Sequence, residues 1–307
     1  MPQPTQVAVI LNASAGGGCN AELSTRIAAG FKAHGLNVAV TLAASADEMI
    51  EAAQSAVIEG VSVIAAGGGD GTMNAVGSLL LGTDIALGVL PLGTLNHLAK
   101  DLHIPLDLDE AIRTIAEGHS IKIDTGEING RTFLNNSSLG LYPDAVRDRE
   151  RQQRRLGRGK WLAFFWAAVT ALRRYPFLDV TISMENQTYQ RRSPLIFIGN
   201  NEYRMEGFNI GLRERLDGGR LSLYVVQRTG RVGLLVLAVR ALMGQLRQVR
   251  EFDMLLAKKI LIKTHHKQIR VATDGEVTRM TTPLLYRICP ATLKVIVPRN
   301  DTSTPGG

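Results

Sequence analysis

Three short loops rich in glycine and other small residues are the first feature of this sequence that could do chemistry. They lie at residues 12–18, 67–72 and 91–96, and each follows a short apolar segment. Small residues let the backbone approach a phosphate closely, and glycine also permits a positive φ. Where such a loop precedes a helix, the N–H groups of the first helical turn favour an anion. The three loops therefore predict one binding site for a polyanion.

The second loop, Gly67-Gly68-Gly69-Asp70-Gly71-Thr72, carries a carboxylate in the middle of this predicted phosphate site. Because Asp70 would repel a phosphate, it predicts a Mg²⁺ that lies between the two groups, bound directly or through water. The loop lacks the Gly-Lys-Ser/Thr ending of a Walker A loop and the glycine spacing of a dinucleotide-binding motif. A glycine-rich turn in which Asp70 caps a helix is the purely structural alternative.

A second candidate group consists of two carboxylates near the C-terminus, Asp274 and Glu276. If both lie on one strand, their spacing of two residues places them on the same face. The Asp-Gly pair at 274–275 also lies between apolar segments, so a hairpin turn is the structural alternative. Both carboxylates remain candidate functional residues.

The elements that must position these residues differ between the two parts of the chain. Up to about residue 120, short apolar segments alternate with helical patterns, which indicates a parallel sheet with helices on both faces. Ligands bind at the carboxyl ends of the strands in such a sheet, where the three loops lie. The expected strands are 6–11, 37–42, 61–66 and 85–90, and the expected helices include 20–34, 46–59 and 72–81.

From residue 121 onward, frequent short strands separated by turn residues predict a mostly antiparallel β-sandwich. One of these expected strands spans residues 131–137, and two helical segments, 160–174 and 232–248, interrupt the pattern. We therefore expect an α/β domain at residues 1–124, a β-rich domain at 125–298 and a flexible tail at 299–307.

Composition limits the class of protein. The chain has 307 residues, of which 45% are hydrophobic and 21% charged, and this balance excludes a disordered or collagen-like chain. Its two cysteines form no disulfide framework and no zinc-binding spacing. The N-terminus lacks the pattern of a secretory signal, and no apolar run is long enough to span a bilayer. We expect a cytoplasmic protein.

The net charge of +7 is concentrated in one window. Residues 147–174 contain nine basic and two acidic residues, so this window accounts for the whole net charge. An apolar, aromatic helical pattern begins within it at Trp161. Such a combination is typical of a helix that lies on an anionic membrane, where each exposed Lys or Arg contributes about 1 kcal/mol. The alternative is that the aromatic residues pack on the β-domain and the arginines are solvated. No nucleic-acid partner is expected, because no recognition module accompanies the window.

Four motifs together resemble the diacylglycerol kinase-type lipid kinases, which include sphingosine kinases and soluble bacterial lipid kinases. Gly-Gly-Asp-Gly-Thr at 68–72 is shared with that family and with NAD kinases. Segment 91–96 resembles the family's Pro-x-Gly-Thr-x-Asn-Asp, and segment 134–140 its Asn-x-x-Ser/Gly-x-Gly. Residues 273–276 resemble its C-terminal Asp-Gly-Glu. The motifs occur in the family's order along nearly the whole chain.

The resemblance implies a two-domain enzyme that transfers the γ-phosphate of ATP, with Mg²⁺, to a hydroxyl of diacylglycerol or a related lipid. It implies a general base at Asp274 or Glu276, and metal binding at Asp70 and at Asp217. The lipid would come from a membrane surface, so peripheral contact with the inner membrane is expected. The residues that the resemblance assigns to the nucleotide are Asn12, Thr41, Gly67, Gly68, Gly69, Asp70, Gly71, Thr72, Met73, Gly93, Thr94 and Asn96.

Three departures from the family pattern support other hypotheses. His97 stands where the family usually has an acid, and the first loop lacks the family's lysine. Gly218 follows Asp217 where some members have a second acid for a structural Mg²⁺, so an ordinary turn is the alternative there. A nucleotide- and lipid-binding protein with little kinase activity is therefore a second hypothesis. An NAD kinase is a third, although that family's second Asn-Glu/Asp motif is absent. The acceptor lipid and the oligomeric state stay open.

Overall fold

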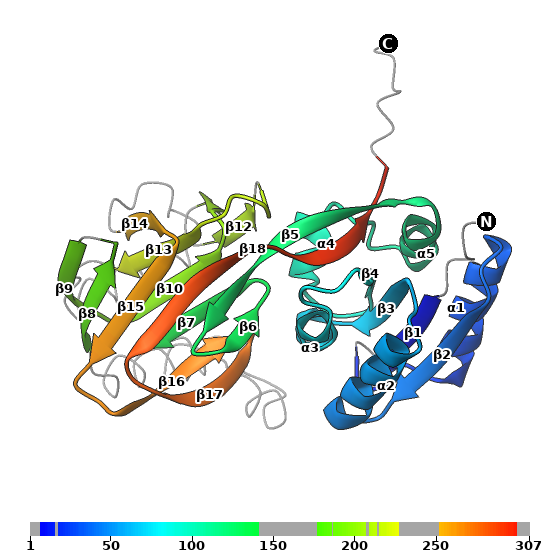
Figure 1. Ribbon diagram of the computed structural model, residues 1–307, viewed down its shortest axis with the longest axis horizontal. Coiled ribbons are helices and arrows are strands. Elements are labelled where there is room, and N and C mark those ends of the chain that lie inside the picture. Colours follow the sequence, from blue (N-terminus) through cyan, green and yellow to red (C-terminus); the bar gives the residue numbers. More distant parts are fainter. Residues whose placement is uncertain are drawn as a thin grey trace, which may run out of the picture. The chain divides into compact units, whose positions relative to one another are not determined.

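The computed structural model of the protein describes residues 7–15, 18–140, 177–185, 187–206, 209–213, 215–226 and 252–299. The chain divides into two compact units (Figure 1). Unit 1 comprises Met1–Thr125 and Pro290–Gly307, and unit 2 comprises Gly126–Cys289. The stretch from Pro290 onward groups with unit 1, whereas the sequence places residues 290–298 in the second domain.

Unit 1 alternates strands and helices in the predicted order, and this confirms the α/β fold. Its parallel sheet has the order β2-β1-β3-β4. The strands are β1 (Val7–Asn12), β2 (Val38–Ala43), β3 (Val63–Gly68) and β4 (Ala86–Pro91). The helices are α1 (Ala21–Ala33), α2 (Ala46–Ile58), α3 (Asp70–Leu79), α4 (His97–Asp101) and α5 (Leu108–Glu117). Strands β3 and β4 are buried along their whole length, as expected for strands covered on both faces.

Local capping explains where several helices begin. The side chain of Asn20 accepts a hydrogen bond from the N–H of Leu23, and the side chain of Ser45 accepts one from Glu48. Side-chain caps of this kind satisfy N–H groups that have no partner within the helix. Helix α3 begins at Asp70, two residues before the predicted start, and its N-cap is Gly69, which offers no side chain for capping. The first turn of α3 is therefore built to take an acceptor from outside the helix.

Two long strands continue from one unit into the other. They are β5 (His119–Ile128) and β18 (Leu284–Val297). The C-terminal part of β18 pairs with β4 in parallel, through Val295 and Leu87. Its N-terminal part pairs with β15 (Lys259–Thr264) in antiparallel. The end of the chain therefore adds a strand to the sheet of unit 1.

Unit 2 is an antiparallel β-sandwich, as predicted. One sheet has the order β14-β13-β10-β7-β16-β17, and the other includes β18-β15-β8-β9. The remaining strands are β6 (Arg131–Phe133), β7 (Asn136–Gly140), β8 (Leu178–Met184), β9 (Gln187–Ser193), β10 (Leu195–Asn200), β11 (Tyr203–Glu206), β12 (Asn209–Arg213), β13 (Leu221–Val226), β14 (Phe252–Ala257), β16 (Gln268–Thr273) and β17 (Glu276–Thr281).

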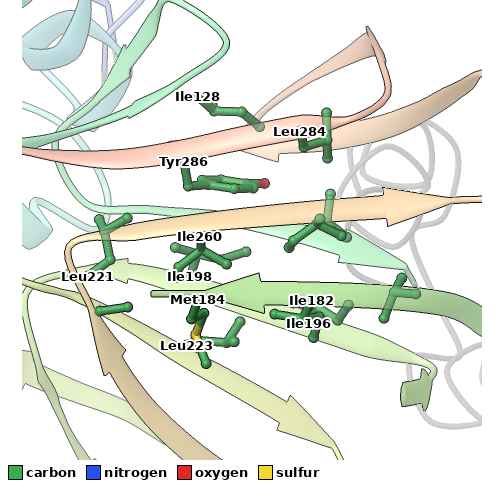
Figure 2. Close-up of a cluster of buried hydrophobic side chains, with 14 of the residues drawn as sticks. Ile128, Ile182, Met184, Ile196, Ile198, Leu221, Leu223, Ile260, Leu284 and Tyr286 are labelled. Atoms are coloured by element: carbon green, nitrogen blue, oxygen red, sulfur yellow. The ribbon is translucent and has the colours of Figure 1, made fainter. Parts of the chain in front are cut away.

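Side chains from both sheets form the core of unit 2 (Figure 2). Ile196, Ile198 and Leu223 come from one sheet, and Ile182 and Ile260 from the other. Tyr286 is fully buried among them, and its hydroxyl forms a 3.1 Å hydrogen bond with the hydroxyl of Ser137. A buried tyrosine usually finds such a partner, because an unpaired hydroxyl is costly in an apolar core.

Several features predicted from the sequence lie outside the described residues. They are the basic window at 147–174, the helices expected at 160–174 and 232–248, and the expected tail beyond residue 299. The strand predicted at 131–137 is divided into β6 and β7, because Leu134 and Asn135 leave the sheet pattern between them. Within the described ranges, no helix is long and apolar enough to cross a membrane.

Candidate functional site

The first two loops of unit 1 are joined by a side-chain hydrogen bond. Asn12, the last residue of β1, donates from Nδ2 to Thr72 Oγ1 at 3.1 Å. The Oδ1 atom of Asn12 accepts the N–H of Ser14 at 2.9 Å, which shapes the first loop. Strands β1 and β3 are neighbours in the sheet, so both loops lie at the same edge. The structure therefore brings together two of the three loops predicted to bind a polyanion.

The second and third loops approach so closely that a side chain would not fit between them. A Cβ atom added to Gly93 would lie 2.4 Å from the Cα of Gly69 and 2.8 Å from Oδ1 of Asn96. A Cβ atom added to Gly68 would lie 2.3 Å from the hydroxyl of Thr72. Neither Gly68 nor Gly93 has a positive φ. Glycine is required at these two positions because of packing.

Asn96 shapes the third loop. Its backbone is left-handed, with φ of 50° and ψ of 48°, a conformation that asparagine tolerates better than most residues. Its Oδ1 accepts the N–H of Gly93 at 3.0 Å, and its Nδ2 donates to the carbonyl oxygens of Pro91 and Gly93. The side chain is buried, and these bonds explain how its polar atoms are satisfied.

Asp70 connects the second loop to helix α4. Its Oδ2 accepts the N–H of His97 at 3.2 Å, and its Oδ1 accepts the N–H of Leu98 at 3.1 Å. Asp70 thus caps α4, and not the helix α3 in which it lies. Both carboxylate oxygens therefore have a structural role as helix caps. A Mg²⁺ held mainly by phosphate oxygens and water needs only one contact with a carboxylate, direct or through water, so the metal role of Asp70 stays a prediction.

The remaining residues predicted to bind a nucleotide occupy different environments. Thr72 and Met73 are buried in the first turn of α3. Thr94 is exposed in the third loop. Thr41 is exposed on the neighbouring strand β2, where it pairs with Ile10. It lies two residues before Ala43, the residue that pairs with Asn12. The loops therefore form one edge site, and Thr41 lies beside it on the adjacent strand.

In unit 2, the Asp274-Gly275 pair forms a two-residue hairpin turn between β16 and β17. The φ values are 47° and 87°, and Thr273 pairs with Glu276 across the turn. Two positive φ values are typical of the type I′ turns that Asp-Gly favours. The structural alternative from the sequence is thus what the chain adopts.

The Asp274 carboxylate has a second role besides the turn. It accepts three backbone N–H groups: Oδ2 accepts that of Leu134 at 2.7 Å, and Oδ1 accepts those of Asn135 and Asn136, each at 2.9 Å. In return, the N–H of Asp274 donates to the carbonyl of Asn136 at 2.9 Å. The turn is therefore fixed to the segment between β6 and β7, and two of the four sequence motifs meet here.

The same segment is held from its carbonyl side by residues that the motifs did not indicate. The carbonyl of Leu134 accepts from Asn200 Nδ2 at 2.8 Å and from Arg213 Nη1 at 2.6 Å. The carbonyl of Asn135 accepts from the hydroxyl of Tyr203 at 3.0 Å and from the N–H of Asn200 at 2.9 Å. Arg213 also donates to the Asn135 side chain at 2.8 Å. No sequence spacing links these residues, so only the sheet pairing reveals them.

The two candidate carboxylates differ in environment. Burial raises the pKa of Asp274 to about 6, although its three N–H donors and the charge of Arg213 act in the opposite direction. Glu276 is solvent-exposed, with 59% of its side chain accessible, and it pairs with Arg131 at 2.5 Å. The more accessible carboxylate of this turn is therefore that of Glu276.

Asp217 lies in a loop with its own internal partner. The guanidinium of Arg215 donates to both of its carboxylate oxygens, at 3.0 and 3.3 Å, and this hydrogen bonding lowers the pKa of Asp217. In the described part of the chain, no group of three or more His, Cys, Asp and Glu residues could hold a metal. The arginine pairing and the glycine at 218 favour an ordinary turn over a structural Mg²⁺.

Comparison with known proteins places both parts of the chain in described families. Residues 6–128 match the diacylglycerol kinase catalytic domain. Residues 138–297 match the YegS C-terminal NAD kinase beta sandwich-like domain. Proteins named diacylglycerol kinase from Staphylococcus aureus strains JH9 and Newman are 31% identical over 180 residues. That match covers 58% of this chain and 56% of each relative, little more than half of either.

Solved structures show the same fold. A structure of a diacylglycerol kinase from Bacillus anthracis strain Sterne has a TM-score of 0.69 at 21% identity. Another structure from the same organism has a TM-score of 0.72 at 24% identity, and both alignments cover 95% of this chain and 97% of the other. The two family models together span most of the chain, and the second alone spans just over half of it. The chain therefore belongs to the diacylglycerol kinase-type family.

Proposed function

We propose that this protein is an ATP-dependent lipid kinase that transfers the γ-phosphate of ATP to a hydroxyl of diacylglycerol or a related lipid. The observation that carries the proposal is the joining of three small-residue loops at one edge of the sheet in unit 1, through the Asn12–Thr72 bond and the Gly69–Gly93 approach. The curated relatives that bear the name diacylglycerol kinase favour a lipid acceptor.

The loops of unit 1 have the properties that bound phosphates require. The N-cap of α3 has no side chain, so the N–H groups of its first turn can donate to a phosphate. Phosphoryl transfer depends mainly on positioning and on charge stabilisation. When bound, Mg²⁺ would neutralise phosphate charge, and Asp70 is the residue that would hold it directly or through water.

We infer that Glu276 accepts the proton of the lipid hydroxyl and that Asp274 orients it. Three of about four acceptor positions of the Asp274 carboxylate are taken by backbone N–H groups, which leaves little access for a substrate. The partner of Glu276 is the half-buried Arg131, and ion pairs that solvent reaches contribute about 1 kcal/mol or less, so a substrate can displace it.

We propose that the basic window at 147–174 contacts an anionic membrane transiently. A lipid acceptor would come from such a membrane. This proposal rests on the sequence alone, in which charge and an aromatic helical pattern are adjacent. It implies a cytoplasmic protein that visits the inner membrane surface. Binding to vesicles that contain anionic lipid should weaken steeply with salt, and binding that is absent or insensitive to salt would contradict it.

Transfer of labelled γ-phosphate from ATP–Mg²⁺ into a total lipid extract tests the function. We expect a labelled lipid with the wild type, and a loss of turnover of about 10²- to 10⁴-fold in Glu276→Gln, since a general base contributes about that much. ATP affinity and melting temperature should stay unchanged. Glu127→Gln is the matched control, because Glu127 also pairs with an arginine of unit 2, Arg287, at 2.7 Å.

The other results of this experiment are equally informative. If no lipid is labelled and a parallel assay with NAD as the acceptor gives phosphorylated NAD, the protein is an NAD kinase. ATP binding without any labelled product would favour a binding protein with little kinase activity. Equal losses in Glu276→Gln and Glu127→Gln would remove Glu276 as the base. A loss in Asp274→Asn with a normal Glu276→Gln would assign the base to Asp274.

A further inference from the structure

Two consecutive peptide groups in the segment between β6 and β7 are hydrogen-bonded at both ends. The first joins Leu134 and Asn135: its carbonyl accepts from Arg213 Nη1 at 2.6 Å, and its N–H donates to Asp274 Oδ1 at 2.9 Å. The second joins Asn135 and Asn136: its carbonyl accepts from the hydroxyl of Tyr203 at 3.0 Å, and its N–H donates to the same oxygen at 2.9 Å. Each peptide group thus connects a buried donor to the Asp274 carboxylate.

This arrangement has a physical consequence for Asp274. A peptide group whose carbonyl accepts a hydrogen bond becomes more polarised, so its N–H becomes a stronger donor. A charged donor such as a guanidinium has a larger effect than a neutral hydroxyl. Arg213 and Tyr203 are 3% and 6% exposed, so solvent weakens these interactions little. The guanidinium of Arg213 also lies 5.5 Å from the centre of the Tyr203 ring, which fixes the two donors together.

We propose that Arg213 and Tyr203 are positioning residues, which act through these two peptide groups to hold the Asp274 carboxylate and with it the turn that carries Glu276. The inference deepens the proposed function and rests on it for its catalytic consequence. The coupling itself is a property of the fold and can be measured without any activity. Both residues reach the Asp274 carboxylate through these peptide groups.

The charged groups around Asp274 come from three elements. Arg213 lies on β12, and its charge stabilises the ionised carboxylate. Arg131 on β6 is half-buried and pairs at 2.5 Å with the exposed Glu276 on β17. A change at Tyr203 leaves all of these charges in place. Its effect on the pKa of Asp274 therefore does not come from the loss of a charge, and the Asn135 carbonyl keeps its bond from the N–H of Asn200.

The test is a ¹³C NMR titration of the Asp274 carboxyl carbon in the full-length wild type and in Tyr203→Phe. We expect the pKa of Asp274 to rise by about half a pH unit in the variant, because one of its N–H donors is weakened. Tyr286→Phe is the matched control. Tyr286 is also a buried tyrosine, but its hydroxyl bonds to the side chain of Ser137 and not to a peptide carbonyl. We expect no change in that variant.

A second pair of variants separates charge from geometry. Arg213→Met should raise the pKa of Asp274 by about one pH unit. Arg213→Lys should raise it by less, because lysine retains the positive charge but lacks the planar guanidinium. If Arg213→Met does not fold, Tyr203→Phe and Arg213→Lys still decide the question. If the pKa of Asp274 is unchanged in Tyr203→Phe, or rises equally in Tyr286→Phe, the inference is overturned.

Activity measurements distinguish a failure of this inference from a failure of the proposed function. With lipid kinase activity established, Tyr203→Phe should lower kcat about 3- to 10-fold while the KM for ATP stays unchanged, since one neutral hydrogen bond contributes about 1 kcal/mol. If the pKa of Asp274 shifts in Tyr203→Phe but the protein has no kinase activity, the coupling is supported and the proposed function is rejected. An active kinase in which Tyr203→Phe changes neither the pKa nor kcat would do the reverse.

Discussion

Asp274 is half-buried and its carboxylate accepts three backbone N–H groups, and these two features act on its charge in opposite directions. Burial is the larger effect and raises its pKa from the ordinary 3.8 to about 6. The folded protein therefore binds the proton of this carboxyl more tightly than the unfolded chain does. The free energy that Asp274 contributes to folding is fully present below about pH 4 and is lost as the pH rises through about 6.

The direction of the pKa shift of Asp274 predicts how the stability of the protein depends on pH. We expect the free energy of unfolding of the wild type, relative to Asp274→Asn, to fall between about pH 4 and pH 7 by at most about 3 kcal/mol, and by less where solvent screens the group. Urea unfolding at several pH values measures it, and titration of other groups cancels in the difference. A difference that grows with pH would mean that the N–H donors and Arg213 outweigh burial.

Between elements, the contact that matters most in unit 1 is that of the second and third loops. The backbone of Gly69 lies so close to Gly93 that a Cβ atom on Gly93 would have to displace the main chain of Gly69 and not a flexible side chain. Main-chain positions in both loops are set by β3 and β4, which are buried and paired with each other. Close packing of this kind couples the geometry of one loop to that of the other.

We therefore expect Gly93→Ala to lower the free energy of unfolding by about 1–3 kcal/mol and to weaken ATP binding in parallel. Gly71→Ala is the matched control for stability, because a Cβ atom at Gly71 would meet no atom within 4 Å. That change lies in helix α3, so stability should stay the same or rise by up to about 1 kcal/mol. Calorimetry and nucleotide titration measure both effects. Equal stability losses in the two variants would contradict the packing argument.

For the molecule as a whole, the division of the chain into units does not follow its order in sequence. Leu293 and Val295 are fully buried in unit 1, and the N–H of Gly82 donates to the carbonyl of Thr292 at 2.9 Å. The hydroxyls of Thr125 and Thr292 are 2.9 Å apart. Residues near the C-terminus thus complete the core of the unit that begins the chain.

A fragment experiment tests this dependence. Residues 1–125 alone should fail to unfold cooperatively and should bind ATP weakly, because loss of the strand exposes apolar surface beside β4. The same fragment with residues 290–299 attached through a flexible linker should recover both properties. Circular dichroism during heating and nucleotide titration distinguish the two. A cooperative, ATP-binding fragment of residues 1–125 would show that the strand is dispensable.

Short-range patterns in the sequence were sufficient for much of this structure. Alternating strands and helices, glycine loops at strand ends and an Asp-Gly turn are determined by neighbouring residues, so each was predictable from its own segment. The α/β fold of unit 1 and the β-sandwich of unit 2 are both confirmed. The motifs also indicated Asn12, Asn96 and Asn135, because each of them lies within a short stretch of characteristic residues.

Tertiary structure alone decided which distant residues meet. Asp70 caps a helix that begins 27 residues later in the chain, at His97. Arg213 reaches a carbonyl 79 positions earlier, at Leu134. The strand predicted at 131–137 is interrupted because the peptide group between Leu134 and Asn135 forms hydrogen bonds with side chains and not with a neighbouring strand. Such contacts depend on strand pairing and packing across the fold, and residue spacing along the chain carries no information about either.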